Sequence, residues 1–377
     1  MFKPFLKKRT TFSDSKFQSL SYNYINNKLE VFKLFINEKT HRKHVAGLSK
    51  KSILSTYRNG NHFTSILEDG TRIRETVFKF SKKLTYDFAE SADVLITKKC
   101  DLGCPYCHED ATTYGQHADL NLPIFDTWHE GTEMAIGGGN VFEHPDLKNF
   151  LIKMKDKKVM CNMTVNQKHI IKHYDQLVYL IENKLVKGIG ISLVDSSDKE
   201  SIEAIEKLYT KTNNIVIHVI AGLVRVQDLN FLHGKKVLIL GYKDNVGRGV
   251  RYKQSFGREI SENIDWLKRN LYMLCHAVFQ VASFDNLALA QLDAKNSLLI
   301  SNKEWKKRFQ GSDYGDNKGK EAPSTFYFDA VNQMIGRSST QPYKDRLQYK
   351  DQTFKEAFEM SLTNYTTNSG VYGELKL

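Results

Sequence analysis

Short apolar runs alternate with helix-like segments over the middle of this 377-residue chain. An apolar run, a helix and a second apolar run at this spacing are typical of parallel strands joined by crossover helices. The pattern predicts an α/β fold, an open, six-stranded partial (β/α)6 barrel, whose functional residues gather on loops at the carboxyl ends of the strands. The expected strands are residues 93–97, 134–136, 159–165, 188–193, 215–220 and 236–240, with helices such as 147–157, 168–183 and 198–211 between them.

The region before this alternation has a different composition. Residues 29–36, 52–57 and 62–67 are strand-like, and Glu68-Asp69-Gly70-Thr71, followed by the apolar-polar run 72–80, is typical of a hairpin. We therefore expect a small β-rich N-terminal domain.

Three parts follow from these patterns: an N-terminal β-rich domain over residues 1–91, a core barrel over 92–249, and a C-terminal extension over 250–377 that closes the barrel. Within the extension we expect a helix at 262–275, strands at 278–283 and 324–335, and a loop at 312–320.

Composition limits the class of protein. Five cysteines, three of them clustered, argue against a secreted disulfide scaffold. The N-terminus lacks the apolar core of a signal peptide, and no apolar run is long enough to span a membrane, so we expect a soluble, cytoplasmic protein. A net charge of +12 permits binding to nucleic acid, although a solvated, lysine-rich surface is the ordinary explanation.

The clustered cysteines are Cys100, Cys104 and Cys107, in the run CDLGCPYCHED directly after the first expected strand. Three thiolates in one loop suit a metal or an iron–sulfur cluster and leave a fourth coordination position open. A structural zinc site is normally closed by a fourth ligand. His108 is the nearest candidate, but its place directly after Cys107 is awkward for a tetrahedral site.

The C-x3-C-x2-C spacing after a strand, with Tyr106 before the last cysteine, resembles the signature of the radical S-adenosylmethionine (SAM) superfamily. The resemblance covers residues 92–245. It implies that the three cysteines bind a [4Fe–4S] cluster, that SAM chelates the fourth iron, and that one-electron cleavage of SAM yields a 5′-deoxyadenosyl radical that abstracts hydrogen from a substrate. It also implies a one-electron reductant of the flavodoxin or ferredoxin type.

A second motif follows the second expected strand. Within Gly137-Gly138-Gly139-Asn140, the resemblance places Gly138, Gly139 and Asn140 on the Gly-Gly-Glu motif that holds the methionine end of SAM, since His144-Pro145-Asp146-Leu147 follows at the family's spacing. Asn140 thus replaces a glutamate that accepts a hydrogen bond from the SAM ammonium. The other explanation for the glycines is a strand-to-helix turn that needs positive φ.

Later strand ends supply further candidates by resemblance: Ser192 for the ribose or carboxylate of SAM, and Tyr106 and the Leu240–Gly241 turn near the adenine. We expect Asn166 to have a structural role in a turn, and His218 to pack in the core rather than act as a ligand. We expect Cys161 and Cys275 to pack as small apolar residues. The loop at 241–249 is glycine-rich and basic without clearly leading into a helix, and Asp285, Gln291 and Asp329 are candidate substrate contacts.

The sequence therefore indicates a radical SAM enzyme that acts on a peptide or protein, with the N-terminal domain as a recognition module. Modification of a nucleic acid or nucleotide is the alternative substrate class, and a non-catalytic metal-binding protein is the alternative of another kind.

Overall fold

The computed structural model of the protein describes residues 22–24, 27–29, 35–68, 70–78, 84–308 and 324–362. The chain forms two compact units, residues 1–87 and residues 88–377. The loop expected at 312–320 lies outside the described residues.

The N-terminal unit contains a three-stranded antiparallel sheet in the order β3-β4-β5. Its strands are β3 (Ile53–Asn59), β4 (His62–Leu67) and β5 (Arg72–Thr76), close to the expected positions, and a short hairpin pairs β1 (Tyr22–Tyr24) with β2 (Asn27–Leu29). Gly70 has a φ of 84° in the β4–β5 turn, as the hairpin prediction requires.

One helix of this unit was not expected. Helix α1 (Glu38–Leu48) begins after Asn37, whose side chain accepts a hydrogen bond from the Thr40 amide at 2.9 Å. Only His41 and Val45 of the helix are buried, so its apolar stripe is too narrow to be recognised in the sequence. Most of the strand expected over residues 29–36 lies outside the described part, which lacks residues 30–34; β2 ends at Leu29, and Phe35 forms a single bridge with Phe78.

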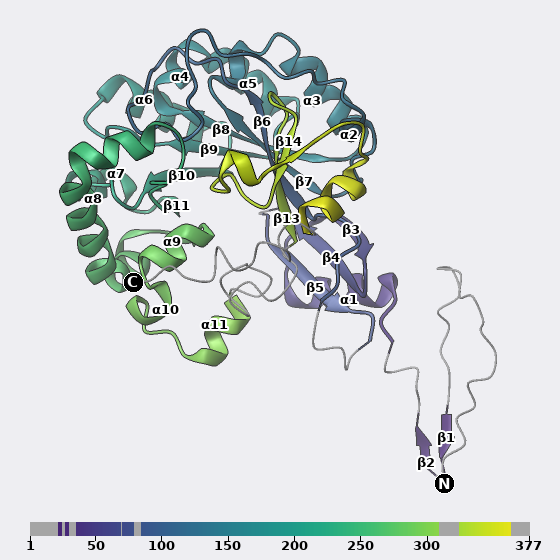
Figure 1. Ribbon diagram of the computed structural model, residues 1–377. Coiled ribbons are helices and arrows are strands. Elements are labelled where there is room, and N and C mark those ends of the chain that lie inside the picture. The colour runs from purple at the N-terminus through teal and green to yellow at the C-terminus, as the bar shows by residue number, and fades with distance from the viewer. Residues whose placement is uncertain are drawn as a thin grey trace. The chain divides into compact units, whose positions relative to one another are not determined.

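A ten-stranded, mostly parallel sheet forms the larger unit (Figure 1). All six expected strands lie side by side in chain order: β6 (Ser91–Thr97), β7 (Glu133–Gly138), β8 (Met160–Asn166), β9 (Gly188–Ser192), β10 (Ile215–Ile220) and β11 (Lys236–Leu240). The α/β class is therefore as predicted.

Four further strands extend this sheet on both sides. β12 (Val281–Phe284) pairs in parallel with β11, and β13 (Thr325–Asp329) pairs in parallel with β6. β14 (Met334–Gly336) and β15 (Leu347–Gln348) complete the β13 side in antiparallel pairing. Among the described residues the pairing defines an open sheet with edges at β12 and β15, and the six-stranded barrel stays a prediction.

The helices that connect the parallel strands follow the outer arc of this sheet in Figure 1. They are α2 (Pro123–Asp126), α3 (Leu147–Asp156), α4 (Gln167–Lys172), α5 (Tyr174–Glu182), α6 (Lys199–Tyr209), α7 (Leu229–Leu232) and α8 (Gly247–Met273).

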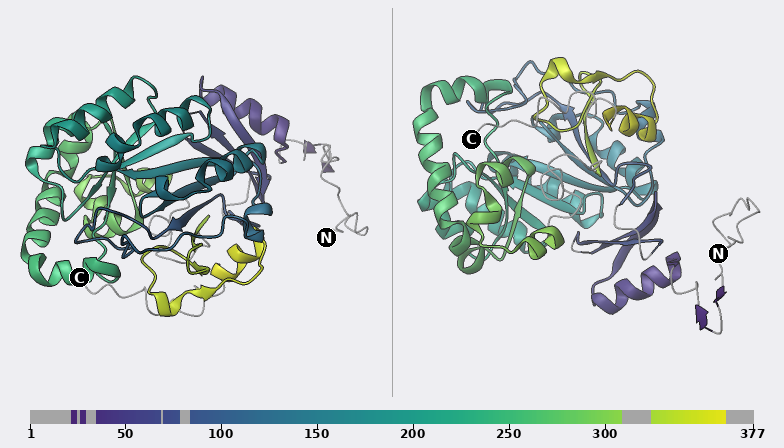
Figure 2. Two further views of the ribbon diagram at one scale, coloured as in Figure 1. Left: turned by 90° about the horizontal axis from the view of Figure 1, so that it is seen from above. Right: turned by 60° about the horizontal axis from the view of Figure 1, so that its bottom comes forward.

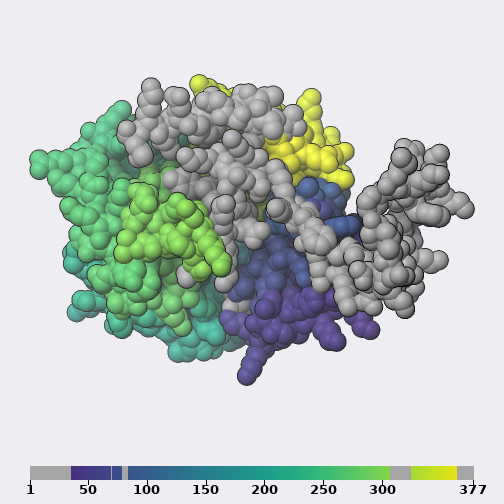
Figure 3. Space-filling view, turned by 90° about the horizontal axis from the view of Figure 1, so that it is seen from below, coloured from purple at the N-terminus to yellow at the C-terminus, as the bar shows by residue number. Residues whose placement is uncertain are grey.

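Helix α8 corrects one expectation, because the glycine-rich loop after β11 leads directly into it. This helix has non-helical angles at Phe256 and lies along one margin of the unit in both views of Figure 2. Three short helices follow: α9 (Asn286–Gln291), α10 (Ala294–Ser297) and α11 (Asn302–Arg308). This part of the chain is bright green in Figure 3 and forms part of the surface seen in that view. None of the described helices is long and apolar enough to cross a membrane.

The two faces of the parallel sheet differ in burial. Apolar side chains that alternate along the strands, such as Val94, Ile136, Val165 and Ile191, are at most 3% exposed. Side chains on the opposite face are partly or fully accessible to solvent, and many are small or polar: Asp93, Ala135, Gly137, Asn162, Thr164, Asn166, Gly190, Ser192 and His218. We call this second set the inner face. An accessible face of small, polar residues leaves space for a ligand.

Candidate functional site

The cysteine loop starts at the carboxyl end of β6 and is held in place by its own backbone. The Cys100 amide donates to the Thr112 carbonyl at 2.8 Å, and the Thr112 amide donates to the Lys98 carbonyl at 2.9 Å. Within the loop the Cys107 amide donates to the Cys104 carbonyl at 3.2 Å. Cys100, Cys104 and Cys107 are all partly exposed, whereas Cys161 is buried and distant in sequence, in β8.

The start of helix α8 braces the same loop. Arg248 donates from Nε to the Cys104 carbonyl at 2.9 Å and from Nη2 to the Ala111 carbonyl at 2.9 Å. Its backbone amide donates to the Cys107 carbonyl at 2.9 Å. A side chain on Gly247, which has a φ of 59°, would come within 2.6 Å of that carbonyl oxygen. The glycine-rich loop therefore holds the cysteine loop by close backbone approach.

The three thiols of the described cysteine loop do not lie within reach of one common point. A tetrahedral zinc ion with bonds of about 2.3 Å brings its sulfur ligands within about 3.8 Å of one another. The described ligand atoms that do lie within 4.8 Å of one another belong to Cys100, Asp101 and His169, and the three thiols do not form such a group. A four-iron cluster needs the wider spacing, because each cysteine binds a different iron.

His108, the nearest candidate for a fourth zinc ligand, pairs with a carboxylate. Its Nε2 lies 3.0 Å from Glu109 Oε1, and Glu109 also accepts from the Tyr327 hydroxyl at 3.2 Å. His169 is the histidine beside Cys100, but its Nε2 contacts Asp101 at 2.9 Å. In both histidines the Nε2 atom is therefore already paired with a carboxylate.

The glycines after β7 pack directly on the base of the cysteine loop. The Gly139 amide donates to the Thr97 carbonyl at 2.7 Å, and the Asn140 amide donates to the Lys99 carbonyl at 2.7 Å. Gly138 has a φ of 126°, and a side chain on Gly139 would lie 2.1 Å from the Lys99 carbonyl oxygen. The glycines therefore have a structural reason to be here, and they also bring the two candidate motifs together.

Asn140 is fully buried and caps the short 3-10 turn η3 (Val141–Glu143). Its Oδ1 accepts from the Phe142 amide at 3.2 Å, and its Nδ2 lies 3.4 Å from His173 Nε2. The carboxylate of Glu143 beside it is accessible and pairs with Lys99 at 3.9 Å. The role of Asn140 in SAM binding stays a prediction, and its amide already has a structural partner.

Ser192, His218 and Gly190 are neighbours on the inner face. Ser192 ends β9 and pairs in register with His218 of β10. The imidazole of His218 lies over Gly190, where any side chain would come within 2.3 Å of the ring. Within the described residues this imidazole makes no hydrogen bond, and burial lowers the pKa of His218 to about 4. It is therefore a neutral histidine on an accessible face, and the sequence expectation of a core histidine is only partly met.

The turn after β11 is used by the protein itself. The Gly241 amide donates to Asp285 Oδ1 at 2.9 Å, and Leu287 packs where a side chain on Gly241 would be. Gln291 makes two hydrogen bonds to the Tyr242 backbone, both at 2.8 Å. These internal contacts fix the conformation of the turn at this end of the sheet, which includes Leu240 and Gly241.

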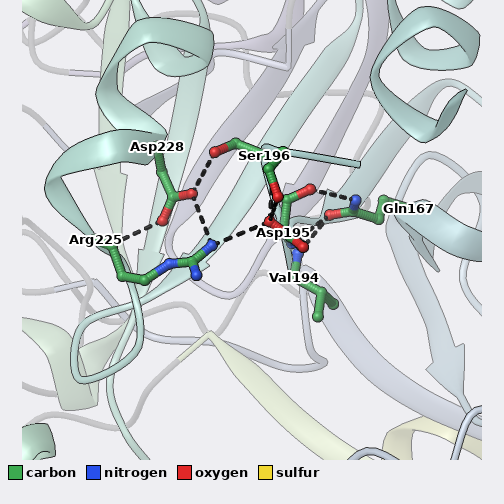
Figure 4. Close-up of polar contacts among 7 residues, drawn as sticks. Gln167, Val194, Asp195, Ser196, Arg225 and Asp228 are labelled. Atoms are coloured by element: carbon green, nitrogen blue, oxygen red, sulfur yellow. Dashed lines mark hydrogen bonds and ion pairs between the residues drawn. The ribbon is translucent and has the colours of Figure 1, made fainter. Parts of the chain in front are cut away.

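Arg225 is a candidate that the sequence did not reveal. It follows β10, and Figure 4 shows its guanidinium between two carboxylates: Nη2 donates to Asp195 at 3.2 Å and to Asp228 at 3.3 Å. Asp228 is buried and also accepts from the Arg225 amide at 2.8 Å and from Ser196. Arg225 is also close enough to Tyr106 to lower the pKa of that phenol, against the larger rise caused by burial. The guanidinium is thus fixed, partly exposed and near the cysteine loop.

Tyr106 itself lies edge-on to Tyr252 of α8, with ring centroids 5.7 Å apart. The structure thus brings the cysteine loop, the β7 glycines and Tyr106 together at the carboxyl ends of the strands. Ser192 and the Leu240–Gly241 turn lie at the same ends of β9 and β11. The sequence signal for Arg225 and Arg248 was weak, because an arginine in a loop is common.

No protein-family profile matches this chain, and no curated protein matches it. Among solved structures, this chain is similar to Streptococcus suis SuiB bound to the precursor peptide SuiA, with 14% sequence identity and a TM-score of 0.46. The match covers 90% of this chain and 71% of the SuiB chain. SuiB bound to S-adenosylmethionine matches at 14% identity and a TM-score of 0.45, covering 89% and 71%.

Proposed function

We propose that the protein is a radical SAM enzyme. The observation that carries the proposal is the joint packing of two motifs: the loop with Cys100, Cys104 and Cys107 is bound through its backbone to the glycine-rich end of β7. Three accessible thiols and an adjacent glycine-rich strand end suit a cluster with one open iron and a small zwitterion bound to it.

When bound, a [4Fe–4S] cluster and SAM supply one-electron cleavage of SAM and a 5′-deoxyadenosyl radical that abstracts hydrogen from the substrate. The three cysteines would hold the cluster, and Arg248 and the β7 backbone keep their loop in one conformation. Gly138 and Gly139 would admit the methionine end of SAM close to the backbone, with Asn140 beside them.

Arg225 is the partner we propose for the SAM carboxylate, with Ser192 on the neighbouring strand. Its guanidinium is already fixed by Asp195 and Asp228, so little side-chain entropy is lost on binding. Tyr106 and the Leu240–Gly241 turn would enclose the adenine.

We propose a peptide or protein as the substrate class, with residues 1–91 as a recognition module, residues 92–249 as the core and residues 250–377 as an extension. Nucleic acid is the second candidate, because the net charge of +12 favours polyanions. Such an enzyme requires a reducing compartment and a one-electron donor of the flavodoxin or ferredoxin type, which points to the cytoplasm.

Anaerobic reconstitution tests this function. We expect about four irons and four sulfides per chain, and slow release of 5′-deoxyadenosine from SAM with dithionite. Replacing Cys100, Cys104 and Cys107 with Ala should remove the iron, whereas the matched variants Cys161→Ala and Cys275→Ala should retain it. Zinc in place of iron, or no 5′-deoxyadenosine from a reducible, loaded sample, would exclude the proposal.

A further inference from the structure

Asp93 is an ionisable residue in the middle of the parallel sheet. It lies on β6 between Tyr327 of β13 and Ala135 of β7, and Asn162 of β8 is next in the same row. Its neighbours along the strand, Ala92 and Val94, are both 1% exposed, whereas the side chain of Asp93 is accessible to solvent. The carboxylate therefore projects from the inner face, next to a residue as small as alanine.

No direct partner of this carboxylate is found in the described part of the chain. Within the described residues it makes no hydrogen bond and no ion pair, although burial by the surrounding protein raises its pKa. Lys243 is the cation that acts on it electrostatically, but the Lys243 ammonium donates to Ser339 Oγ at 2.8 Å. An accessible carboxylate without an ion pair can bind a cationic group through a charge-assisted hydrogen bond without first losing a partner.

The other acidic groups of this region are already bonded. Glu109 accepts from Tyr327, and Asp285 accepts from the amides of Gly241 and Ala288. Asp329 accepts from Asn332 and lies 3.8 Å from both the Lys98 ammonium and Arg346 Nη1.

Carboxylates outnumber lysine and arginine side chains in this described cluster. Asp93, Glu109, Asp285 and Asp329 interact with Lys98, Lys243 and Arg346, and the pKa of His108, which pairs with Glu109, is lowered by burial. Among the described residues, Asp93 is the one of these four acids without a hydrogen bond or an ion pair.

We infer that Asp93 binds a cationic group of the substrate, an ammonium or a guanidinium, on the inner face of the sheet. The inference rests on the proposed function, since it assigns this face to the substrate. Asp93 lies four residues before the end of β6, about 13 Å along the strand from the cysteine loop. At that separation Asp93 is not part of the cysteine loop, and its role is to hold one end of the substrate.

Short peptides test this inference without knowledge of the natural substrate. The probes are Ac-Gly-X-Gly-amides with X as lysine, arginine, norleucine or glutamate, titrated calorimetrically into the reconstituted, SAM-bound protein. We expect the lysine or the arginine peptide to bind at least tenfold more tightly than the norleucine peptide. In Asp93→Asn that ratio should fall close to one.

The matched control is Asp265→Asn, which removes the same charge from an exposed position on α8 and should leave the ratio unchanged. Lys243→Met should bind the cationic peptide at least as tightly as the unmodified protein, because a competing cation is removed. Iron content and the thermal unfolding midpoint establish that each variant is folded and loaded.

Equal affinity for charged and uncharged peptides, absence of binding by either cationic peptide, or an unchanged ratio in Asp93→Asn would overturn the inference. The proposed function is judged separately, on iron content and 5′-deoxyadenosine release by the unmodified protein. Release of 5′-deoxyadenosine without cation preference would reject the role of Asp93 alone.

Discussion

Arg248 Nε donates a hydrogen bond of 2.9 Å to the backbone carbonyl of Cys104, although the two residues are 144 positions apart in the chain. The backbone carbonyl of one candidate iron ligand is thus held by a charged side chain from helix α8. The contact makes the conformation of the cysteine loop depend on helix α8.

We predict that Arg248→Met lowers iron retention several-fold in a chelator challenge, because Cys104 and Ala111 both lose their charge-assisted donor, at a cost of about 1.5–3 kcal/mol each. Arg251→Met, an exposed position on the same helix, is the control and should behave as the unmodified protein. Equal iron loss from both variants would contradict the bracing role of Arg248.

Gly139→Ala should destabilise the fold by at least about 1–3 kcal/mol and reduce cluster loading, since its methyl group would lie 2.1 Å from the Lys99 carbonyl oxygen. Gly137→Ala, two residues earlier, is the matched control, because nothing lies within 4 Å of its added carbon. Thermal unfolding and iron analysis distinguish the two. A stable, fully loaded Gly139→Ala protein would show that the strand end and the cysteine loop are not packed in this way.

Arg225→Met is expected to weaken SAM binding by about tenfold or more, corresponding to about 1.4 kcal/mol. Loss of a fixed guanidinium removes a charge-assisted contact to the SAM carboxylate. Equilibrium dialysis with the reconstituted protein measures the dissociation constant. Arg258→Met, on an exposed part of α8, controls for the change in net charge, and unchanged affinity in Arg225→Met would remove this residue from the SAM site.

His218 should make stability depend on pH. Its pKa is about 4 in the fold and about 6.5 in the unfolded chain, so the unfolded state binds more protons between these values. Stability is therefore complete above about pH 6.5 and falls as the pH decreases toward about 4.

Urea unfolding of the reconstituted protein from pH 7 to pH 5 measures this loss, and His218→Gln should reduce it. The buried histidines His41 and His144 have pKa values lowered in the same sense, so a residual slope is expected. An identical slope in both proteins would mean that His218 titrates normally in the fold.

Much of this architecture follows from local sequence. The six strands β6–β11 were predicted because runs such as residues 215–220 are apolar, short and separated by helix-length segments, and such periodicity is a property of neighbouring residues. The cysteine motif was equally clear, because its three candidate ligands lie within one loop. The narrow stripe of α1 and the start of α8 at Gly247 were missed because their burial depends on other elements.

The strand–helix order and the place of three thiols at a strand end were predictable from the sequence, since both are encoded by residues close together in the chain. The contact of Arg248 with Cys104, the contact of Arg225 with Asp195 and the lack of an ion pair at Asp93 among the described residues became visible in the folded chain alone. The first two contacts join residues 144 and 30 positions apart, and the third depends on a whole sheet face, so they arise when burial and register bring distant groups together.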